Sequence, residues 1–150
     1  MKKYLFDTSV IVAGTLESHP HLVPARRWLG AATGKKIEAF VSVHSLAELY
    51  SNLSVPHQDS ISSPKIAREM IDEWISSVFN VIEFKLSDYQ KAIERVSRRS
   101  LRGGIIYDSL HVQAALKRKV NALVTLNSKH FDQLVKEGEL QIFNPLADKP

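Results

Sequence analysis

Lys3-Tyr4-Leu5-Phe6-Asp7-Thr8-Ser9 is the stretch from which we infer the fold. It begins with a short apolar run that stops at an aspartate, and short apolar runs bounded by polar residues are typical of buried strands. Residues 8–16 then have the pattern of a helix that begins directly after the strand. A strand that runs straight into a helix delivers Asp7 to the edge of a sheet.

Four more segments share this short apolar character, at residues 39–41, 80–83 and 122–125 and, more weakly, at 141–143. Helix patterns separate them, and residues 54–63 lack periodicity, which predicts a loop. Because the strands are continuous apolar runs, they favour a mostly parallel sheet that helices cover on both faces. We therefore expect an α/β fold, a three-layer α/β/α arrangement with a five-stranded, mostly parallel sheet.

Serines and prolines indicate where the helices begin. A serine hydroxyl accepts a hydrogen bond from a helix amide at the N-cap, and proline suits the first helical turn. One predicted helix carries Leu46, Leu49, Tyr50 and Leu53 on its apolar face. The expected helices run from Pro20 and Pro24 to Ala32, from a cap at Ser45 past Leu53, from Pro64 through Trp74, from a cap at Ser87 to about Ser100, and over residues 106–119.

Length and composition are those of one folded domain. The chain has 150 residues, of which 44% are hydrophobic and 24% charged, close to the averages of globular proteins. The sequence has neither a repeat nor a linker-like stretch, so we expect a single domain over residues 1–150. No segment approaches the roughly 20 apolar residues that span a bilayer.

Two further features bear on location and on metal chemistry. Asp7 interrupts the first apolar run well before the about 7 to 15 apolar residues that a secretory signal needs. We therefore expect a cytoplasmic protein without membrane association. The chain has no cysteine, which excludes disulfides and thiolate metal sites. Oxygen or imidazole would have to bind any metal, and this favours hard cations such as Mg²⁺.

The charge of the chain favours a polyanionic partner. The formal net charge is +4, and Arg95, Arg98, Arg99 and Arg102 follow a helical spacing that puts them on one face if the helix continues that far. Such a row suits a phosphate backbone. The alternative is an ordinary solvated helix face, partly neutralised by Glu94.

Three acidic residues each have an ordinary structural explanation when taken alone. Asp7 would cap the helix that it precedes, and Glu48 would be a solvated helix residue. Asp108 would interact with the dipole of the helix in whose first turn it lies.

The explanation changes when these residues are considered together with Asn127. In parallel α/β folds, ligands bind beyond the carboxyl ends of the strands, where the strand order reverses. Asp7 and Asn127 both follow strands there, and Glu48 and Asp108 can reach the same edge. Converging carboxylates repel unless cations lie among them. An oxygen-only site suits Mg²⁺ or Mn²⁺ and the hydrolysis of phosphodiesters.

Four segments resemble, in order, the motifs of PIN-domain nucleases. They are Phe6-Asp7-Thr8-Ser9, Leu46-Ala47-Glu48-Leu49, Ile106-Tyr107-Asp108-Ser109-Leu110-His111 and Val124-Thr125-Leu126-Asn127-Ser128-Lys129-His130-Phe131. Each motif is weak alone, but four in sequence are fairly specific. The resemblance extends from residue 3 to residue 143, and the chain is similar in size to the VapC-like toxins of toxin–antitoxin pairs.

The resemblance implies a magnesium-dependent endoribonuclease with catalytic residues at Asp7, Glu48, Asp108 and Asn127. The first three would bind Mg²⁺ or Mn²⁺, with Thr8 and Ser9 as polar neighbours of Asp7. It further implies RNA as the substrate, an antitoxin protein that silences the enzyme, and a homodimer. The resemblance favours the toxin and leaves a housekeeping RNA-processing nuclease as an alternative.

Asn127 departs from the family pattern, which more often has a fourth aspartate at this position. An amide oxygen can bind a cation but adds no charge. The alternative function is therefore a catalytically idle PIN module that binds RNA or protein. A phosphoacceptor receiver domain is a second alternative, but no acid adjoins Asp7, and the third strand ends at Glu83 rather than at an aspartate.

Three basic residues lie close to the acidic ones in the sequence. His111 follows Asp108 by one helical turn and would either support the site by orienting water or phosphate, or bond to a backbone group. Lys129 is a candidate RNA contact. For Lys129 and its neighbour His130, a solvated loop is the alternative.

Overall fold

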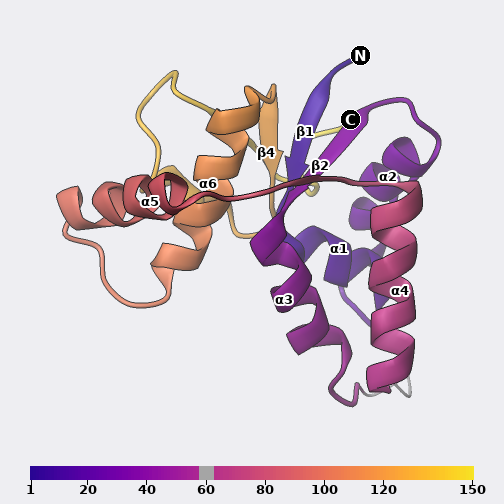
Figure 1. Cartoon of the computed structure of the whole chain (residues 1–150). Coiled ribbons are helices and arrows are strands. Elements are labelled where there is room, and N and C mark those ends of the chain that lie inside the picture. Colours follow the sequence, from indigo (N-terminus) through magenta and orange to yellow (C-terminus); the bar gives the residue numbers. More distant parts are fainter. Residues whose placement is uncertain (58–62) are drawn as a thin grey trace.

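Five parallel strands form one sheet in the computed structural model, which describes residues 1–57 and 63–150 (Figure 1). The strand order is β3-β2-β1-β4-β5, and every neighbouring pair is parallel. The expected fold class is confirmed, and the sheet is wholly rather than mostly parallel. The strands are β1 (Lys3–Phe6), β2 (Glu38–Ser42), β3 (Asn80–Ile82), β4 (Ala122–Val124) and β5 (Gln141–Phe143).

Helices cover both faces of this sheet. Figure 1 shows α5 and α6 on one side of the strands and α1, α2 and α4 on the other. A short helix, α7, follows β4 and was not predicted. The helices are α1 (Thr8–Thr15), α2 (Leu22–Thr33), α3 (Val43–Leu53), α4 (Pro64–Ser77), α5 (Leu86–Arg98), α6 (Ile105–Arg118) and α7 (Ser128–Asp132).

The core has two halves, one on each face of the sheet. Successive side chains of a strand point to opposite faces, so Tyr4 and Phe6 of β1 pack with α1 and α2, while Leu5 packs with α6. The central strand is buried on both faces, and this explains why its sequence is a continuous apolar run.

Two of the predicted caps are wrong. Helix α3 begins directly after β2, and its cap is Ser42, whose hydroxyl accepts a hydrogen bond from the Ser45 amide at 3.3 Å. Ser45 is a buried residue of the first turn. In the same helix Tyr50 is exposed rather than part of the apolar face. Two serines lie near the start of this helix. Ser42 is the cap because β2 passes into α3 without a loop.

The second wrong cap concerns α5. This helix begins at Leu86, and the Asp88 carboxylate accepts a hydrogen bond from the Lys85 amide at 2.8 Å, so Ser87 lies within the first turn. The helix ends at Arg98 rather than near Ser100, whose φ of 53° is incompatible with a continuing helix. The four arginines therefore do not form one continuous helical row.

The start of α4 is as predicted. The Ser63 hydroxyl accepts a hydrogen bond from the Ile66 amide at 3.1 Å, and Pro64 is the first helical residue. Of the loop expected before it, residues 58–62 lie outside the described residues.

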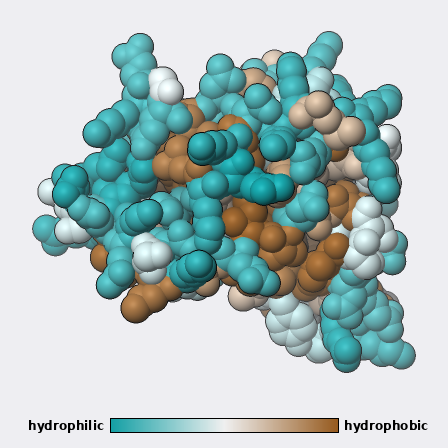
Figure 2. Space-filling model, turned by 45° about the horizontal axis from the view of Figure 1, so that its top comes forward, coloured by the Kyte–Doolittle hydropathy of each residue, from teal (hydrophilic) through white to brown (hydrophobic). Residues whose placement is uncertain are grey.

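The face of the molecule drawn in Figure 2 is largely hydrophilic, with hydrophobic residues gathered in its middle. In the part of the chain that the structure describes, no helix is long and apolar enough to cross a membrane.

The order of the strands places the candidate site. Because β1 lies between β2 and β4, the direction of the strand order reverses beside it, and the carboxyl edge opens there. The Asp7 amide donates a hydrogen bond to the Val124 carbonyl at 2.9 Å. The segments that follow β1 and β4 therefore start side by side.

Candidate functional site

A pocket of about 560 Å³ lies at this carboxyl edge. Residues after β1, on α3, at the start of α6 and after β4 line it, so segments distant in the sequence meet there. The pocket brings together all four residues predicted to be catalytic and the two predicted polar neighbours. Its lining includes Asp7, Thr8, Ser9, Glu48, Asp108 and Asn127.

Asp7 is buried, and hydroxyl groups rather than helix amides hold its carboxylate. Asp7 occupies the N-cap position of α1, yet its side chain makes no cap hydrogen bond. Its Oδ2 instead accepts hydrogen bonds from Ser9 Oγ at 2.7 Å and from Thr125 Oγ1 at 2.8 Å. The capping explanation is therefore wrong for Asp7, and the carboxylate is fixed at the pocket wall.

These hydroxyl groups also join the segments after β1 and β4. The Leu126 amide donates to Ser9 Oγ at 3.2 Å, and the Asn127 amide donates to Thr125 Oγ1 at 2.9 Å. Both hydroxyls thus accept a backbone hydrogen bond while they donate to Asp7. This network fixes the backbone of Asn127, which is exposed to solvent at the pocket.

His111 is fully buried and contacts two of the acidic residues. Its Nε2 lies 2.7 Å from Glu48 Oε1 and 3.6 Å from Asp7 Oδ1, and its Nδ1 lies 3.1 Å from Ser42 Oγ. The expectation that a backbone group satisfies this histidine is wrong, because its partners are side chains. His111 connects α6 to α3 and to the end of β1.

The contact between His111 and Glu48 shifts the pKa values of both residues. Burial lowers the pKa of His111, but the hydrogen bond to Glu48 and the charge of Asp7 outweigh it, so the pKa lies above its usual value. Burial likewise raises the pKa of Glu48, but the hydrogen bond and charge of His111 bring it below its usual value. The two residues therefore favour an imidazolium–carboxylate ion pair.

Asp108 lies in a different electrostatic environment. Burial, followed by the charge of Asp7, raises the pKa of Asp108 to about 6. The imidazole of His130 is near, with Nδ1 3.5 Å from Asp108 Oδ2. The raised pKa means that the folded protein disfavours a second carboxylate charge beside Asp7.

The donor chemistry of the pocket fits a hydrated hard cation. Among the described residues, no three or more Asp, Glu and His side chains converge into a preformed metal cage. Mg²⁺ retains several water molecules and is often bound through only one or two carboxylates, so it needs no such cage.

Two observations support this fit. A cation would relieve the repulsion between Asp7 and Asp108, which contributes to the raised pKa of Asp108. The Thr8 hydroxyl is also buried and has no partner at normal hydrogen-bond geometry, even though Thr8 is among the groups that lower the pKa of Glu48. A water molecule on the cation would give this hydroxyl a partner.

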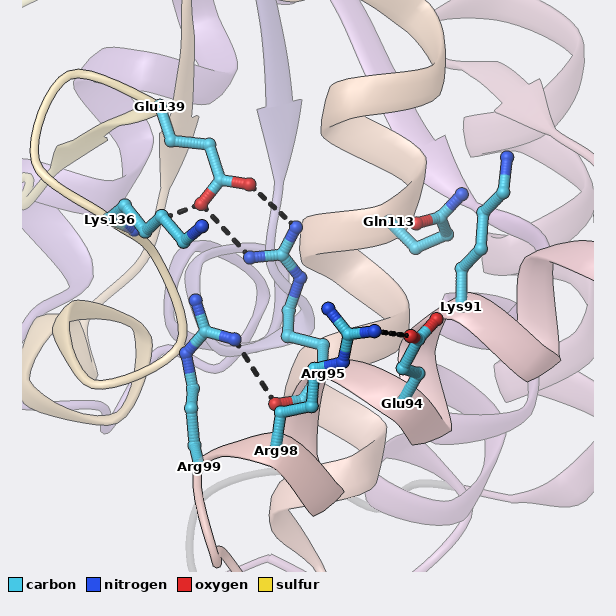
Figure 3. A pocket seen from close by; sticks show the side chains of 8 residues that line it. All are labelled: Lys91, Glu94, Arg95, Arg98, Arg99, Gln113, Lys136 and Glu139. Carbon is cyan, nitrogen blue, oxygen red and sulfur yellow. Dashed lines mark hydrogen bonds and ion pairs between the residues drawn. The ribbon is translucent and has the colours of Figure 1, made fainter.

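The predicted RNA-binding arginines lie elsewhere. Arg95, Arg98 and Arg99 line a separate pocket of about 520 Å³, drawn in Figure 3. Arg95 makes two hydrogen bonds with Glu139, at 2.7 and 3.0 Å, and a third with the Leu134 carbonyl at 2.8 Å.

Other groups engage the remaining arginines to different degrees. Arg98 pairs with Glu94 at 2.5 Å, and Arg99 donates to the Arg95 carbonyl at 3.1 Å. Arg102 lies in the segment between α5 and α6, Lys129 lies on α7, and both are exposed. The arginine side chains thus differ widely in how available they are to a ligand.

Sequence reasoning gave no role to several residues of the site. Thr125 was expected in a strand and in the fourth PIN-like motif but without a role of its own, although a hydroxyl residue two positions before Asn127 at a strand end is a usable signal. Ser42 was overlooked in favour of Ser45. His44 lies one helical turn before Glu48, with Nε2 3.6 Å from Glu48 Oε1.

A wholly parallel α/β sheet with an acidic pocket at its switch point is the architecture of a ligand-binding or catalytic domain. The PIN-domain family model matches residues 4–137. The chain therefore belongs to the PIN-domain family, as the motifs predicted.

Solved structures with a similar fold include a toxin–antitoxin complex from Klebsiella pneumoniae, with 15% identity and a TM-score of 0.64, covering 95% of this chain and 97% of that one. VapBC2 from Rickettsia felis, bound to a DNA fragment from its promoter, contains a chain with 21% identity and a TM-score of 0.67, covering 95% of this chain and 98% of that one. FitAcB from Neisseria gonorrhoeae has 15% identity and a TM-score of 0.70, and the match covers 97% of this chain and 99% of that one.

A further structure is VapC20 of Mycobacterium tuberculosis, described as a toxin that cleaves the sarcin–ricin loop. Its identity is 18%, its TM-score 0.63, and the coverage 80% of this chain and 86% of that one. Comparison with curated proteins gives no match.

Proposed function

We propose that this protein is a metal-dependent endoribonuclease of the VapC-like toxin type, using Mg²⁺ or Mn²⁺. The observation that carries the proposal is the pocket that joins Asp7, Glu48 and Asp108 with Asn127 at the switch point of the sheet. Membership of the PIN-domain family supports it. Further support comes from the similar fold of VapC20, which cleaves the sarcin–ricin loop.

In this proposal Asp7, Glu48 and Asp108 would hold the cation. When bound, the cation would activate water and neutralise charge on the phosphate being cleaved. Ser9 and Thr125 keep the Asp7 carboxylate in one orientation through two short hydrogen bonds. This rigidity is what a metal ligand needs in order to keep its geometry.

His111 and Asn127 have supporting roles in the same proposal. His111 is a positioning residue, because its hydrogen bond keeps Glu48 turned towards Asp7. Asn127 lies exposed on the pocket lining. Its amide group is available to bond to a phosphate oxygen or to a water molecule without adding charge to the site.

Cleavage of single-stranded RNA by the purified protein tests the proposal. We expect cleavage with Mg²⁺ or Mn²⁺ and none with EDTA. The catalytically idle PIN module is the competing function, for which Asn127 is the motivating residue. RNA binding without cleavage in either metal would establish the idle module and overturn the nuclease.

The partners follow from the toxin proposal. The similar fold of the toxin–antitoxin complex from Klebsiella pneumoniae supports a small antitoxin as partner here, and the family resemblance supports a homodimer. Co-expression with the product of a short adjacent gene should relieve growth arrest, and light scattering should give twice the monomer mass. A cytoplasmic location remains a prediction, which cell fractionation would test.

A further inference from the structure

An aromatic pair lies beside the acidic pocket. Tyr107 belongs to the first turn of α6 and immediately precedes Asp108, while His44 belongs to the first turn of α3, one turn before Glu48. The two rings are stacked, with centroids 5.1 Å apart and planes inclined by only 6°. Each helix that supplies an acidic residue to the pocket therefore also supplies a ring to this pair.

Packing of the core does not explain the position of Tyr107. Its ring belongs to neither of the two hydrophobic clusters, and 52% of the residue is exposed, while the later residues Leu110 and Val112 of the same helix are buried. His44 lies against one face of the tyrosine ring, and with centroids 5.1 Å apart the two parallel rings are offset. More than half of Tyr107 remains accessible to a ligand.

An open aromatic face that a second ring supports is suited to stacking. Unpaired RNA bases are recognised mainly by stacking on aromatic side chains, and any base can do so because each has a π-face. The partner ring matters because it holds the tyrosine in a single orientation, so that less freedom is lost on binding.

We propose that Tyr107, supported by His44, forms a subsite for one nucleobase of the RNA, next to the acidic pocket. This inference rests on the proposed nuclease function and adds a base-binding residue to it. His44 links this subsite to the pocket, because its ring stacks on Tyr107 while its Nε2 lies 3.6 Å from Glu48 Oε1. A base on Tyr107 would then place the adjoining phosphate towards the acidic pocket.

The first experiment uses a single-stranded RNA that the wild-type protein cleaves at one mapped position. Kinetics are measured for Tyr107→Leu and Tyr107→Phe, on the intact RNA and on copies with one abasic nucleotide near the cleavage position. Tyr107→Leu should raise KM roughly 5- to 150-fold, because a stacked base is lost. Tyr107→Phe, which keeps the ring face, should stay within about threefold of wild type.

The abasic substrates identify the contact itself. For the wild-type protein, an abasic nucleotide at one position should raise KM as much as the substitution Tyr107→Leu does on intact RNA. For the Tyr107→Leu protein, the same abasic nucleotide should leave KM unchanged. Tyr89→Leu on α5 is the matched control, because Tyr89 is also exposed and has no part in the pocket. An unchanged KM for Tyr107→Leu, or an abasic effect equal in both proteins, would overturn the subsite.

A second experiment does not depend on cleavage. An RNA with 2-aminopurine at successive positions is titrated in EDTA, where stacking on a ring quenches the fluorescence. Wild type and Tyr107→Phe should quench one position strongly, and Tyr107→Leu should not. If no RNA is cleaved but this difference holds, the nuclease proposal fails and the subsite stands. Equal quenching by all three proteins would overturn the subsite alone.

Discussion

At the scale of single residues, Asp7 and Asp108 differ in what they contribute to the fold. Two hydroxyl groups stabilise the Asp7 carboxylate, whereas burial and the charge of Asp7 raise the pKa of Asp108 to about 6. The two carboxylates would serve the same catalytic site, yet without a cation the fold provides hydrogen-bond donors for Asp7 and disfavours the ionised form of Asp108. Their substitution should therefore separate activity from stability.

We expect Asp7→Asn and Asp108→Asn each to lower RNA cleavage by at least about 100-fold, because each removes a charged metal ligand. Their stabilities should move in opposite directions. Above pH 6 the ionised Asp108 carboxylate disfavours folding, so Asp108→Asn should stabilise the metal-free protein by about 1 to 3 kcal/mol. Asp7→Asn should destabilise it. If the amide oxygen takes the place of Oδ2 and accepts from Ser9 and Thr125, the NH₂ group takes the place of Oδ1 and faces His111 Nε2, which lies 3.6 Å from Oδ1 in the wild type.

Urea denaturation in EDTA at pH 7.5, alongside cleavage assays in Mn²⁺, measures both effects. Asp72→Asn on α4 is a suitable control, since Asp72 is exposed and distant from the pocket lining. Wild-type cleavage by either variant would show that the pocket is not the catalytic site.

Asn127 allows the complementary change. Asn127→Asp would add a charge to a pocket that already disfavours ionisation of Asp108. We expect the affinity for Mn²⁺ to rise and the stability of the metal-free protein to fall. Calorimetric titration and thermal melts with and without the metal measure these effects. If neither quantity changes, the side chain of residue 127 points away from the site.

At the scale of elements, the contact between α5 and α6 depends on a buried carboxylate. Asp88 Oδ2 accepts hydrogen bonds from Lys117 Nζ at 2.6 Å and from the Lys85 amide at 2.8 Å, and its Oδ1 accepts from Gln113 at 3.2 Å. The hydrogen bond from Lys117, followed by that from Lys85, lowers the pKa of Asp88 to about 2. The ionised form of Asp88 therefore stabilises the folded protein.

Asp88→Asn should reduce the free energy of unfolding at pH 7 by about 1 to 3 kcal/mol. The folded pKa lies below the unfolded value, so this stabilisation is fully present above about pH 4 and is lost as the pH falls towards 2. Urea denaturation at pH 7 and at pH 2.5 should show a large difference between wild type and variant at pH 7 and a much smaller one at pH 2.5. An equal difference at both pH values would exclude ionised Asp88 as the cause.

The elements also show how far sequence reasoning reaches. Every strand was predicted within one or two residues. For β1, β2 and β4 the reason is that a buried parallel strand is a continuous apolar run, while the edge strands β3 and β5 keep a short apolar run although they are only partly buried. The caps at Ser45 and Ser87 were wrong because each segment offers several polar side chains near the helix start. The choice among them depends on how the preceding chain arrives, and this is set by tertiary packing.

The site was predictable to a similar extent. Asp7 and Asn127 were placed at the carboxyl edge because they follow strands, and the motif order brought in Glu48 and Asp108. The hydrogen bond from Thr125 to Asp7 and the contact between Ser42 and His111 join residues distant in the sequence. Local patterns can therefore indicate these hydroxyl groups but not their partners. The arginine row was expected to continue along one helix, but α5 ends at Arg98.

At the scale of the whole molecule, the basic side chains proposed to bind RNA differ in how free they are to contact a phosphate. Arg95 forms an ion pair with Glu139. The substitution Arg95→Glu would therefore place two carboxylates together and would test folding rather than RNA binding. Arg98 is paired with Glu94, whereas Arg99 and Arg102 have no carboxylate partner among the ion pairs of the described residues. Together with Lys129, these two remain the most available of the proposed RNA contacts.

Reversal of Arg99 and Arg102 to glutamate should weaken RNA binding and flatten its salt dependence. Each lost phosphate contact should reduce the slope of log K against log salt concentration by about 0.7. Fluorescence anisotropy with a labelled RNA at several salt concentrations measures this slope. Lys2→Glu with Lys36→Glu is the matched control, since these exposed lysines precede β1 and β2 at the opposite edge of the sheet. An equal loss in the control would indicate a general effect of net charge.

The hydrogen bond between Thr125 and Asp7 also has a consequence for the order of events during synthesis. The two residues are 118 positions apart. Strand β1 leaves the ribosome before the other strands of this sheet, yet it pairs on one side with β4, which follows β2 and β3 in the sequence. A ribosome-bound chain that has not yet released β4 cannot assemble the pocket. We expect stalled nascent chains ending near residue 120 to leave neighbouring RNA intact, and released chains that contain β4 to cleave it, so that the time of translation itself delays the onset of the proposed activity.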